Sequence, residues 1–385
     1  MTRMKSALTI DDLKTMARRR VPKMFFDYAD SGSLTEGTYN RNETDFEKIL
    51  LRQRVAADIE NRTTAAKMIG IDTTMPVGLA PTGLTGMFDA DGEIKAARAA
   101  EKFGVPFILS TMSICSIEDI AAHTTKPFWF QLYVMRDREF IYGLIDRAKA
   151  AGCSALVVTV DLQVLAQRHK DLRNGVSVPP RFGLKSAWQV GTRPFWALRM
   201  LTTTRRWTFR NIVGHVKGVG NLRSLGEWTN AQFDPTLNWK DFEWIKKRWG
   251  GKIIVKGILD AEDAQAAVDA GADAIIVSNH GGRQLDGAPS SIRALPPIVD
   301  AVGKKVEVHM DGGIRTGVDV MRALALGAKG TYIGRPFLYG LAAGGEAGVT
   351  RTLEIIHNEL NKTQGFCGEN DPANVGRHNI FSIDF

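Results

Sequence analysis

Cysteine is scarce in this chain of 385 residues, which contains only Cys115, Cys153 and Cys367. Three is an odd number, and none of the three stands in a CxxC or Cys/His spacing. Neither a disulfide framework nor a zinc site is therefore indicated, and we expect no bound metal. The cysteine usage is typical of a protein from a reducing compartment.

Long apolar runs are also missing. No stretch of about 18 apolar residues occurs, and the first 22 residues contain no apolar core of the kind found in signal peptides. We therefore expect neither a cleaved leader nor a membrane-spanning helix. The expected location is the cytoplasm or the cytoplasmic face of the inner membrane.

Acidic residues are absent from one long segment, residues 172–226. That segment holds ten basic residues, which leaves 40 basic and 42 acidic residues in the other 330 positions. The net charge of +8 is therefore a property of this insertion, and the rest of the chain is close to neutral. A basic insertion of this kind points to an anionic partner.

A dinucleotide-binding fingerprint is missing too, because the first apolar strand is followed by APTGLTG and not by GxGxxG. Short apolar runs instead alternate with longer helical patterns, which predicts parallel βα units. This is the pattern of an α/β protein built as a (β/α)8 TIM barrel. The eight predicted strands are Val77–Ala80, Pro106–Leu109, Phe128–Leu132, Ala155–Val160, Ile253–Val255, Ala274–Val277, Val306–Met310 and Gly330–Ile333.

The domain organisation follows from these strands. Residues 1–75 form a helical preface whose first long helix is predicted from Asp11 to Arg20, with Thr9 and Asp11 as its caps. Residues 76–360 form the barrel, and the basic, aromatic-rich insertion at 172–230 follows the fourth strand. Residues 361–385 are expected to be a C-terminal tail that closes the barrel.

Polar residues follow every predicted strand, and in a TIM barrel all of these positions meet on one face. A need to leave the core would explain serine, threonine and glycine there, but it does not easily explain lysine, histidine, arginine and aspartate. We therefore predict an active site at this face. Its candidate residues are Pro81, Thr82, Gly83, Ser110, Gln131, Tyr133, Thr159, Asp161, Lys256, Ser278, His280, Arg283, Asp311, Gly312, Gly313, Arg315, Gly334 and Arg335.

Two parts of this set indicate specific chemistry. In SNHGGRQLD, a base (His280) and a fixed cation (Arg283) stand three residues apart around two glycines, which suits proton removal from an anionic small molecule. The last two strand ends, DGGIR and GR, supply glycine amides and guanidiniums at the usual phosphate site of such barrels. Flavin mononucleotide (FMN) is the economical redox cofactor, with Lys256 placed to stabilise an anionic reduced ring.

The motifs APTGL, FQLYV, TVD, VKG, SNHGGRQLD, DGGIR and GRP, in this order and spacing, resemble those of the FMN-dependent α-hydroxy-acid oxidases and dehydrogenases. Within that family the chain resembles the bacterial respiratory L-lactate dehydrogenases through FDPTLNWKDFEWI and the basic insertion. It is nearly as similar to mandelate dehydrogenases around APTGL and STMSICSIED.

The resemblance implies a role for each candidate residue. His280 is similar to the family's general base and Asp161 to the carboxylate behind it, while Tyr133 would hydrogen-bond the substrate oxygen. Tyr28, Arg168 and Arg283 would bind the substrate carboxylate. The FMN ring would be held by Thr82, Ser110, Gln131, Thr159, Lys256 and Ser278, and its phosphate by Gly313, Arg315, Gly334 and Arg335.

The activity implied is oxidation of a small L-2-hydroxy acid, foremost L-lactate to pyruvate, without NAD and with electrons passing to a quinone or cytochrome. A homotetramer is also implied. A soluble hydroxy-acid oxidase and a mandelate dehydrogenase are the nearest alternatives, and a non-redox FMN-binding or phosphate-binding barrel is the alternative of a different class. Gly83 stands where many oxidases of the family have alanine, which favours a dehydrogenase.

The insertion mixes its cations with aromatic residues, a composition typical of segments that lie at a membrane interface. We therefore expect peripheral attachment to an anionic membrane surface. A solvated loop is the plain alternative, and a single-stranded nucleic-acid patch is a third that we do not favour. Between Arg181 and Arg210 the aromatic residues are Phe182, Trp188, Phe195, Trp196, Trp207 and Phe209.

Overall fold

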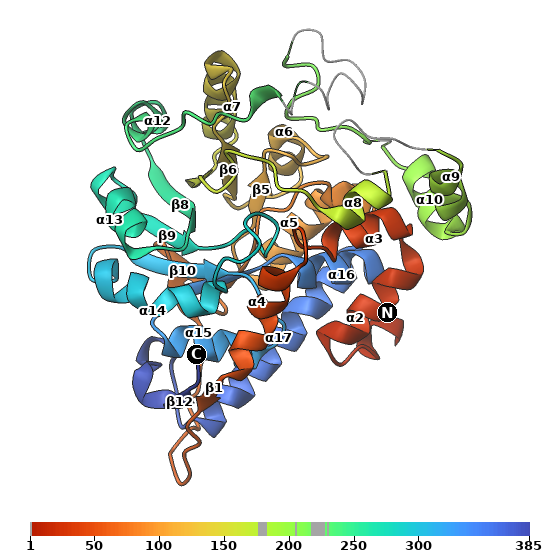
Figure 1. Cartoon of the computed structure of the whole chain (residues 1–385). Coiled ribbons are helices and arrows are strands. Elements are labelled where there is room, and N and C mark those ends of the chain that lie inside the picture. Colours follow the sequence, from red (N-terminus) through yellow and green to blue (C-terminus); the bar gives the residue numbers. More distant parts are fainter. Residues whose placement is uncertain (1, 176–182, 205, 217–227, 229–230) are drawn as a thin grey trace.

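Eight parallel strands form a barrel at the centre of the molecule (Figure 1). A computed structural model describes all of the chain except residues 1, 176–182, 205, 217–227 and 229–230. The strands follow one another in chain order around the sheet, and a parallel bridge between Leu79 and Phe107 joins the first to the second. The strands are β4 Val77–Leu79, β5 Ile108–Ser110, β6 Trp129–Tyr133, β7 Ala155–Thr159, β8 Lys252–Ile258, β9 Ala274–Val277, β10 Glu307–Asp311 and β11 Gly330–Ile333.

The strands form because their apolar runs can be buried on both faces, as a parallel sheet covered by helices requires. Strands β4, β5, β7 and β9 are buried along their whole length. The predicted TIM barrel and its eight strands are therefore confirmed. The surrounding helices are α5 Gly92–Phe103, α6 Ile117–Ala121, α7 Arg138–Ala150, α12 Asp241–Trp249, α13 Ala261–Asp269, α14 Ser291–Val302, α15 Gly317–Ala325, α16 Arg335–Gly344 and α17 Glu346–Phe366.

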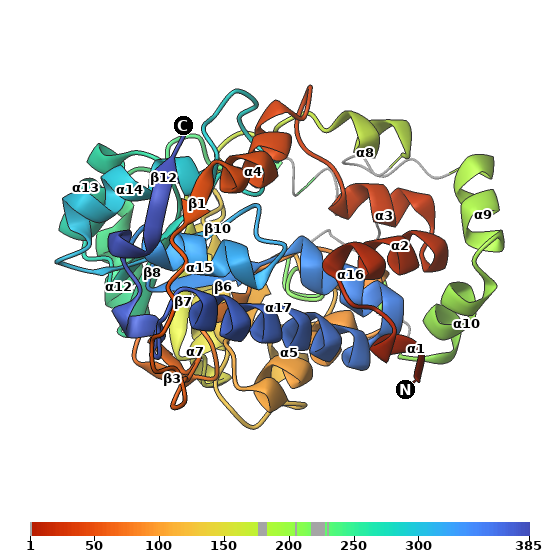
Figure 2. The same ribbon diagram turned by 90° about the horizontal axis from the view of Figure 1, so that it is seen from below.

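The N-terminal preface packs against the barrel beside α16 and α17 (Figure 2). Its first long helix, α2, has Thr9 as N-cap, but the reciprocal partner in the capping box is Asp12 and not Asp11. The C-terminal strand β12 Ile380–Ile383 pairs with β1 Ile49–Leu51, so the tail joins the preface in a separate small sheet. The helices of the preface are α1 Thr2–Lys5, α2 Ile10–Arg20, α3 Lys23–Ala29 and α4 Gly37–Glu47, and its remaining strands are β2 Ala66–Met68 and β3 Ile71–Thr73.

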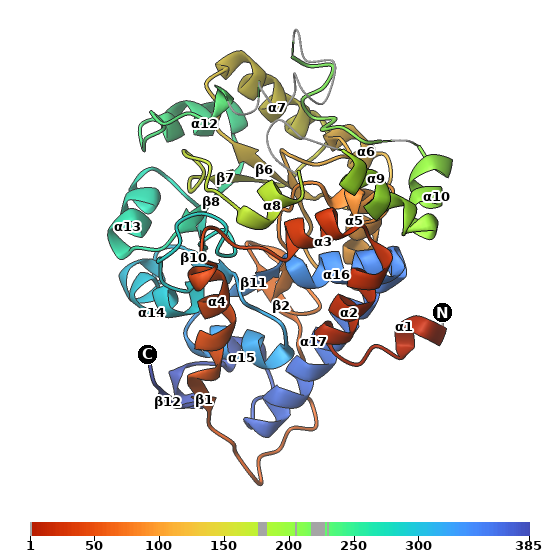
Figure 3. The ribbon, with the colours of Figure 1, turned by 45° about the vertical axis from the view of Figure 1, so that its right-hand side comes forward.

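The segment after β7 contains α8 His169–Arg173, whose end overlaps the insertion at 172–230, and the insertion continues into two helices, α9 Leu184–Gly191 and α10 Pro194–Thr202. These two helices lie at the periphery, on the side of the barrel opposite α13 and α14 (Figure 3). The solvated-loop interpretation is therefore wrong for residues 184–191 and 194–202. Phe182 and four of the basic residues, Arg181, Arg205, Lys217 and Arg223, lie outside the described residues. Among the described helices, none combines the length and the apolar character needed to cross a bilayer.

Candidate active site

A cavity of about 450 Å³ opens where the barrel strands end at their carboxyl sides. Small-molecule sites typically occupy about 300–1,000 Å³, so the volume suits a cofactor and a small substrate. Most of the candidate residues line this cavity: Tyr28, Pro81, Thr82, Gly83, Ser110, Tyr133, Thr159, Arg168, Lys256, His280, Arg283, Asp311, Gly312, Gly313, Arg315, Gly334 and Arg335. The remaining three, Gln131, Asp161 and Ser278, stand directly behind lining residues and contact them or their neighbours.

The imidazole of His280 is held between a carboxylate and a phenol. Its Nδ1 lies 2.9 Å from Oδ1 of Asp161, and its Nε2 lies 3.3 Å from the hydroxyl of Tyr133. The backbone of His280 is left-handed, with φ of 58°, and its N–H donates to Oγ of Ser278 at 3.1 Å. Asp161 orients one ring nitrogen, so the other faces the cavity as a base.

Asp161 packs tightly against β8 because residue 257 is a glycine. A Cβ at Gly257 would lie 2.8 Å from both Cβ and Cγ of Asp161, and the φ of 107° at this position also disfavours any other residue. The glycine of the VKG motif is therefore required for the carboxylate to reach His280.

Arg283 and Arg168 converge on the same cavity from different loops. Arg283 donates through Nη1 to the carbonyls of Tyr28 and Ser31, and its guanidinium stacks 4.6 Å from the centre of the Tyr28 ring. Arg168 donates through Nε to the carbonyl of Arg283 at 3.5 Å. The sequence has no glycine two residues before Arg168, yet the side chain still lines the cavity. Two planar cations at one point form a site suited to a carboxylate.

Several buried polar atoms deeper in the cavity have no partner within the described chain. Gln131 accepts through Oε1 from Ser110 and Thr111, which leaves its Nε2 unsatisfied. Oγ1 of Thr159 and Oδ1 of Asp311 are unsatisfied as well. Buried polar groups are costly unless they are hydrogen-bonded, so these atoms match a ligand with a polar ring edge.

Lys256 is the buried cation in this part of the cavity. It is 4% exposed and donates to Oγ of Ser278 at 2.7 Å, and it lies 3.1 Å from Oδ2 of Asp311. Gln131, Thr159 and Lys256 thus offer an amide, a hydroxyl and a cation to one ring system. The donor set fits the isoalloxazine ring of FMN.

At the other end of the cavity, Arg335 and Arg315 could bind an anion, and both also contact residues of the preface. Arg335 donates to the carbonyls of Ala29 and Ser31, each at 2.8 Å, and Arg315 donates to Glu43 at 2.6 Å. Gly313 has φ of 89°, and a Cβ there would lie 1.8 Å from the carbonyl oxygen of Asn42. Glycine, two guanidiniums and the N-terminus of α16 fit a phosphate group.

The preface anchors the loop that carries His280, a contribution that the sequence did not reveal. Asn42 and Asn279 form a reciprocal pair of side-chain hydrogen bonds at 2.8 and 2.7 Å. Asp286 accepts from the backbone N–H groups of Thr35 and Thr38, each at 2.9 Å. These partners are more than 230 positions apart, and no local pattern pairs them.

An apolar wall completes the cavity on the side of the insertion. Leu84 and Leu162 line it together with Met112, and the insertion adds Trp207 and Phe209. Residues of the insertion therefore form part of the cavity wall.

Comparisons with known proteins agree with this arrangement. The profile of a family described as FMN-dependent dehydrogenase matches residues 17–382. An L-lactate dehydrogenase of Caulobacter vibrioides is 46% identical over 94% of this chain and 95% of its own length. One from Actinobacillus pleuropneumoniae is 47% identical over 97% and 98%.

Solved structures give the same result. A crystal structure of the monotopic membrane protein (S)-mandelate dehydrogenase superposes with a TM-score of 0.93 at 34% identity, covering 98% of this chain and all of that one. A mandelate oxidase superposes with a TM-score of 0.80 at 36% identity, over 96% of both chains. The expected cofactor, FMN, is thereby confirmed, while the role of each side chain stays a prediction. The chain, matched over residues 17–382 by the family profile and along nearly its whole length by its relatives, belongs to the FMN-dependent dehydrogenase family.

Proposed function

We propose that this protein oxidises a small L-2-hydroxy acid, foremost L-lactate to pyruvate, without NAD. The observation that carries the proposal is the placement of the His280–Asp161 pair and of Arg283 and Arg168 around one cavity. The relatives named L-lactate dehydrogenase, at 46–47% identity, support L-lactate as the substrate.

The chain's own groups have distinct tasks in this reaction. Arg283 and Arg168 hold the substrate carboxylate, assisted by Tyr28, and Tyr133 donates to a substrate oxygen. Nε2 of His280 takes a proton from the substrate, and the negative charge of Asp161 stabilises the resulting imidazolium. This placement serves whether the α-hydrogen leaves as a hydride or as a proton. FMN, when bound, accepts the two electrons of the oxidation.

Anaerobic addition of a panel of 2-hydroxy acids tests this function. We expect the yellow protein to be bleached by L-lactate at lower concentrations than by glycolate or (S)-mandelate, and air to restore the colour slowly. Rapid recolouring with one peroxide per flavin would instead favour an oxidase. Preferential bleaching by (S)-mandelate would favour a mandelate dehydrogenase. That alternative is supported by the structural similarity to (S)-mandelate dehydrogenase and by the apolar wall of the cavity. A flavoprotein that none of these acids bleaches would contradict the proposal and favour a non-redox barrel.

We further propose that the electrons pass to a quinone or cytochrome at the cytoplasmic face of the inner membrane, where α9 and α10 attach the protein. Their inner sides are fixed to the barrel: Trp196 donates its indole N–H to the carbonyl of Met87, and Gln189 accepts from the backbone N–H of Met24. Their outer sides expose large apolar residues, namely Leu184 (92% exposed), Trp188 (74%), Phe195 (81%) and Leu198 (58%).

The chemistry of this outer face suits an anionic bilayer. Large exposed apolar patches on soluble proteins mark interaction sites, and the insertion adds basic residues without any acidic residue between 172 and 226. Only part of the aromatic content faces outward, because Trp196 and Phe209 pack against the barrel beneath. The name of the related monotopic mandelate dehydrogenase also supports attachment without a spanning helix.

Replacing Leu184, Trp188 and Phe195 by serine should release the protein from membranes. Burying each such side chain contributes ~1.5–3 kcal/mol, so losing three should shift nearly all protein to the supernatant when vesicles with anionic phospholipid are sedimented. The control replaces three exposed apolar residues elsewhere on the surface, Val55, Phe366 and Phe381, which are 66–81% exposed. This control should still sediment, and both variants should retain L-lactate bleaching.

If the wild type stays in the supernatant with such vesicles, the attachment proposal is wrong. Salt-sensitive binding of an oligonucleotide by a protein that ignores vesicles would favour a nucleic-acid patch. We also propose a homotetramer, which light scattering on the detergent-solubilised protein tests directly.

A further inference from the structure

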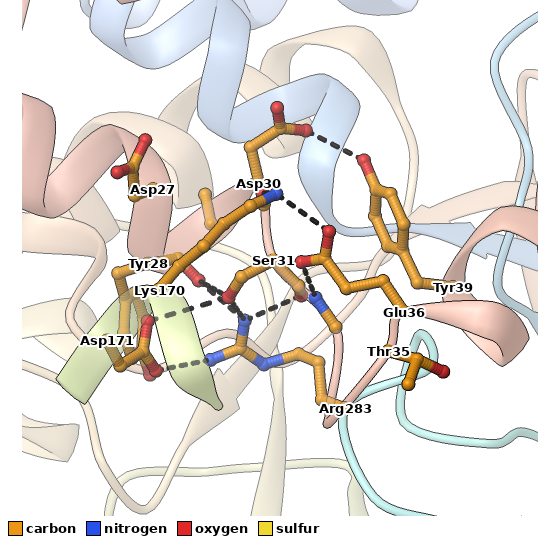
Figure 4. A network of polar contacts seen from close by, with 12 residues as sticks. Asp27, Tyr28, Asp30, Ser31, Thr35, Glu36, Tyr39, Lys170, Asp171 and Arg283 are labelled. Carbon is orange, nitrogen blue, oxygen red and sulfur yellow. Dashed lines mark hydrogen bonds and ion pairs between the residues drawn. The ribbon is translucent and has the colours of Figure 1, made fainter. Parts of the chain in front are cut away.

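A carboxylate that the sequence motifs did not single out, Asp171, lies beside both arginines of the substrate site. It is on α8, 6% exposed, and it lines the cavity. Its Oδ2 lies 3.6 Å from Nη1 of Arg168 and 3.9 Å from Nη2 of Arg283. Figure 4 shows it facing the guanidinium of Arg283 across the network that joins α3, the following loop and α8.

Asp171 contributes mainly charge to the two arginines, and its Oδ1 also accepts a long hydrogen bond of 3.5 Å from the hydroxyl of Ser31. Both distances to the arginines exceed the 2.7–3.2 Å of a hydrogen bond. The guanidinium of Arg283 is oriented instead by the carbonyls of Tyr28 and Ser31, and Arg168 by the carbonyl of Arg283. Removing the charge of Asp171 should therefore leave both cations in place.

One nitrogen of the Arg283 guanidinium is still available to donate a hydrogen bond to a ligand. Nη2 of Arg283 is buried and has no hydrogen-bond partner among the described residues, whereas Nη1 is satisfied three times, by Tyr28 and by two oxygens of Ser31. The available donor is also the atom nearest to Asp171. A substrate carboxylate that bonds to Nη2 would thus come close to the carboxylate of Asp171, and the two anions would share the same cations.

We propose that Asp171 competes electrostatically with the substrate carboxylate for Arg168 and Arg283, and thereby weakens the binding of 2-hydroxy acid and 2-oxo acid so that product leaves readily. The inference rests on the proposed function, because both ligands are then carboxylates. Burial raises the pKa of Asp171 in spite of the opposing attraction of Arg283 and Arg168. The competition itself rests on position, since Oδ2 of Asp171 lies within 4 Å of a guanidinium nitrogen of each arginine.

The decisive variant is Asp171→Asn, which removes the charge at constant shape. Oxalate is a suitable probe, since it is a small carboxylate without a C–H bond to oxidise, and its binding can be followed by calorimetry on the flavin-loaded enzyme. We expect the Kd to fall about tenfold, the effect of removing a like charge a few ångströms away at intermediate dielectric. The KM for L-lactate should fall as well, while kcat stays equal or decreases as release slows.

Asp27→Asn is the matched control. Asp27 is another buried carboxylate between α3 and α8, where it accepts from Nδ2 of Asn174 at 2.7 Å, but it contacts neither arginine. Its Kd for oxalate should stay within about twofold of the wild-type value. A gain in affinity common to both variants would indicate loosened packing and overturn the proposal.

A weaker or unchanged Kd in Asp171→Asn would also overturn it, because the proposal requires that removing this negative charge strengthens the binding of an anion. If this variant lacks flavin or melts early, Asp171→Ser, which also removes the charge, must show the same tightening. Bleaching of the wild-type flavin by L-lactate distinguishes a failure of the proposal for Asp171 from a failure of the proposed function. Normal bleaching without tightening rejects only the role of Asp171, and no bleaching by any 2-hydroxy acid rejects the proposed function.

Discussion

Replacing His280 by asparagine should lower kcat for L-lactate oxidation by ~1,000-fold while the protein keeps its flavin. The physical reason is that the hydrogen-bond partner of Nε2 among the described residues, Tyr133, is a poor substitute for the base, since burial raises the pKa of its hydroxyl above the ordinary value. Asparagine is chosen because residue 280 has φ of 58°, a conformation that asparagine tolerates better than most residues.

The fold of the loop should survive this change. The loop is held through its neighbours, since Asn279 pairs with Asn42 and Gly282 donates to Oδ1 of Asn279 at 2.9 Å. Flavin absorbance per protein and the Kd for oxalate should therefore match the wild type, because neither depends on a base. Activity within tenfold of the wild type would show that another group removes the proton.

The barrel could be predicted from the sequence because its signals are local. Buried parallel strands read as continuous apolar runs, and each helix carries its own start and stop. Helix α5, for example, ends where Gly104 adopts φ of 83°, and a glycine is the usual local stop signal for a helix. Pro194 in the first turn of α10 is a similar local signal, because proline is favoured at the start of a helix. It indicates a helix within the insertion.

The support of the site could not be predicted in the same way, because it depends on contacts between distant segments. Asn42 is an ordinary helical asparagine in the sequence, and Asp171 is one acidic residue in a charged stretch. Each gains its importance only when the preface and α8 are folded against the β9 loop. The motifs therefore identify most of the residues that line the cavity, whereas the residues that support them from behind become apparent only in three dimensions.

Arg315 and Arg335 illustrate the same limit. The sequence predicts two cations for a phosphate, and both do line the cavity. Yet Arg335 also stacks 4.5 Å from the centre of the Tyr39 ring and bonds to the end of α3, so it joins the preface to the barrel. The preface is thus part of the site, since it supplies Tyr28, fixes Arg283 and supports the phosphate end.

Replacing Asp161 by asparagine should lower kcat about 100-fold and leave the yellow colour intact. A hydrogen bond to a charged group contributes ~1.5–3 kcal/mol, which corresponds to ~10- to 150-fold in rate. Asparagine can still accept from Nδ1 of His280 through its side-chain oxygen, so the ring should keep its orientation. The variant therefore removes mainly the charge that stabilises the imidazolium.

The pKa of Asp161 explains why this charge is present throughout the working range. Burial alone would raise that pKa, but the attraction of His280, its hydrogen bond and the charge of Lys256 bring the net value below the ordinary one. A carboxyl with a lowered pKa in the folded protein stays ionised, and stabilises the fold, until the pH falls through the lowered value. Activity of the wild type should accordingly show no loss from protonation of Asp161 above about pH 4.

Two further measurements distinguish a lost charge from a damaged site. The Kd of Asp161→Asn for oxalate should stay close to that of the wild type, since Arg168 and Arg283 bind the carboxylate and Asp161 is not among their contacts. The Asp27→Asn protein again serves as control and should keep wild-type kcat. A kcat of Asp161→Asn within threefold of the wild type would contradict the electrostatic role, because the base would then work equally well without an anion 2.9 Å behind it.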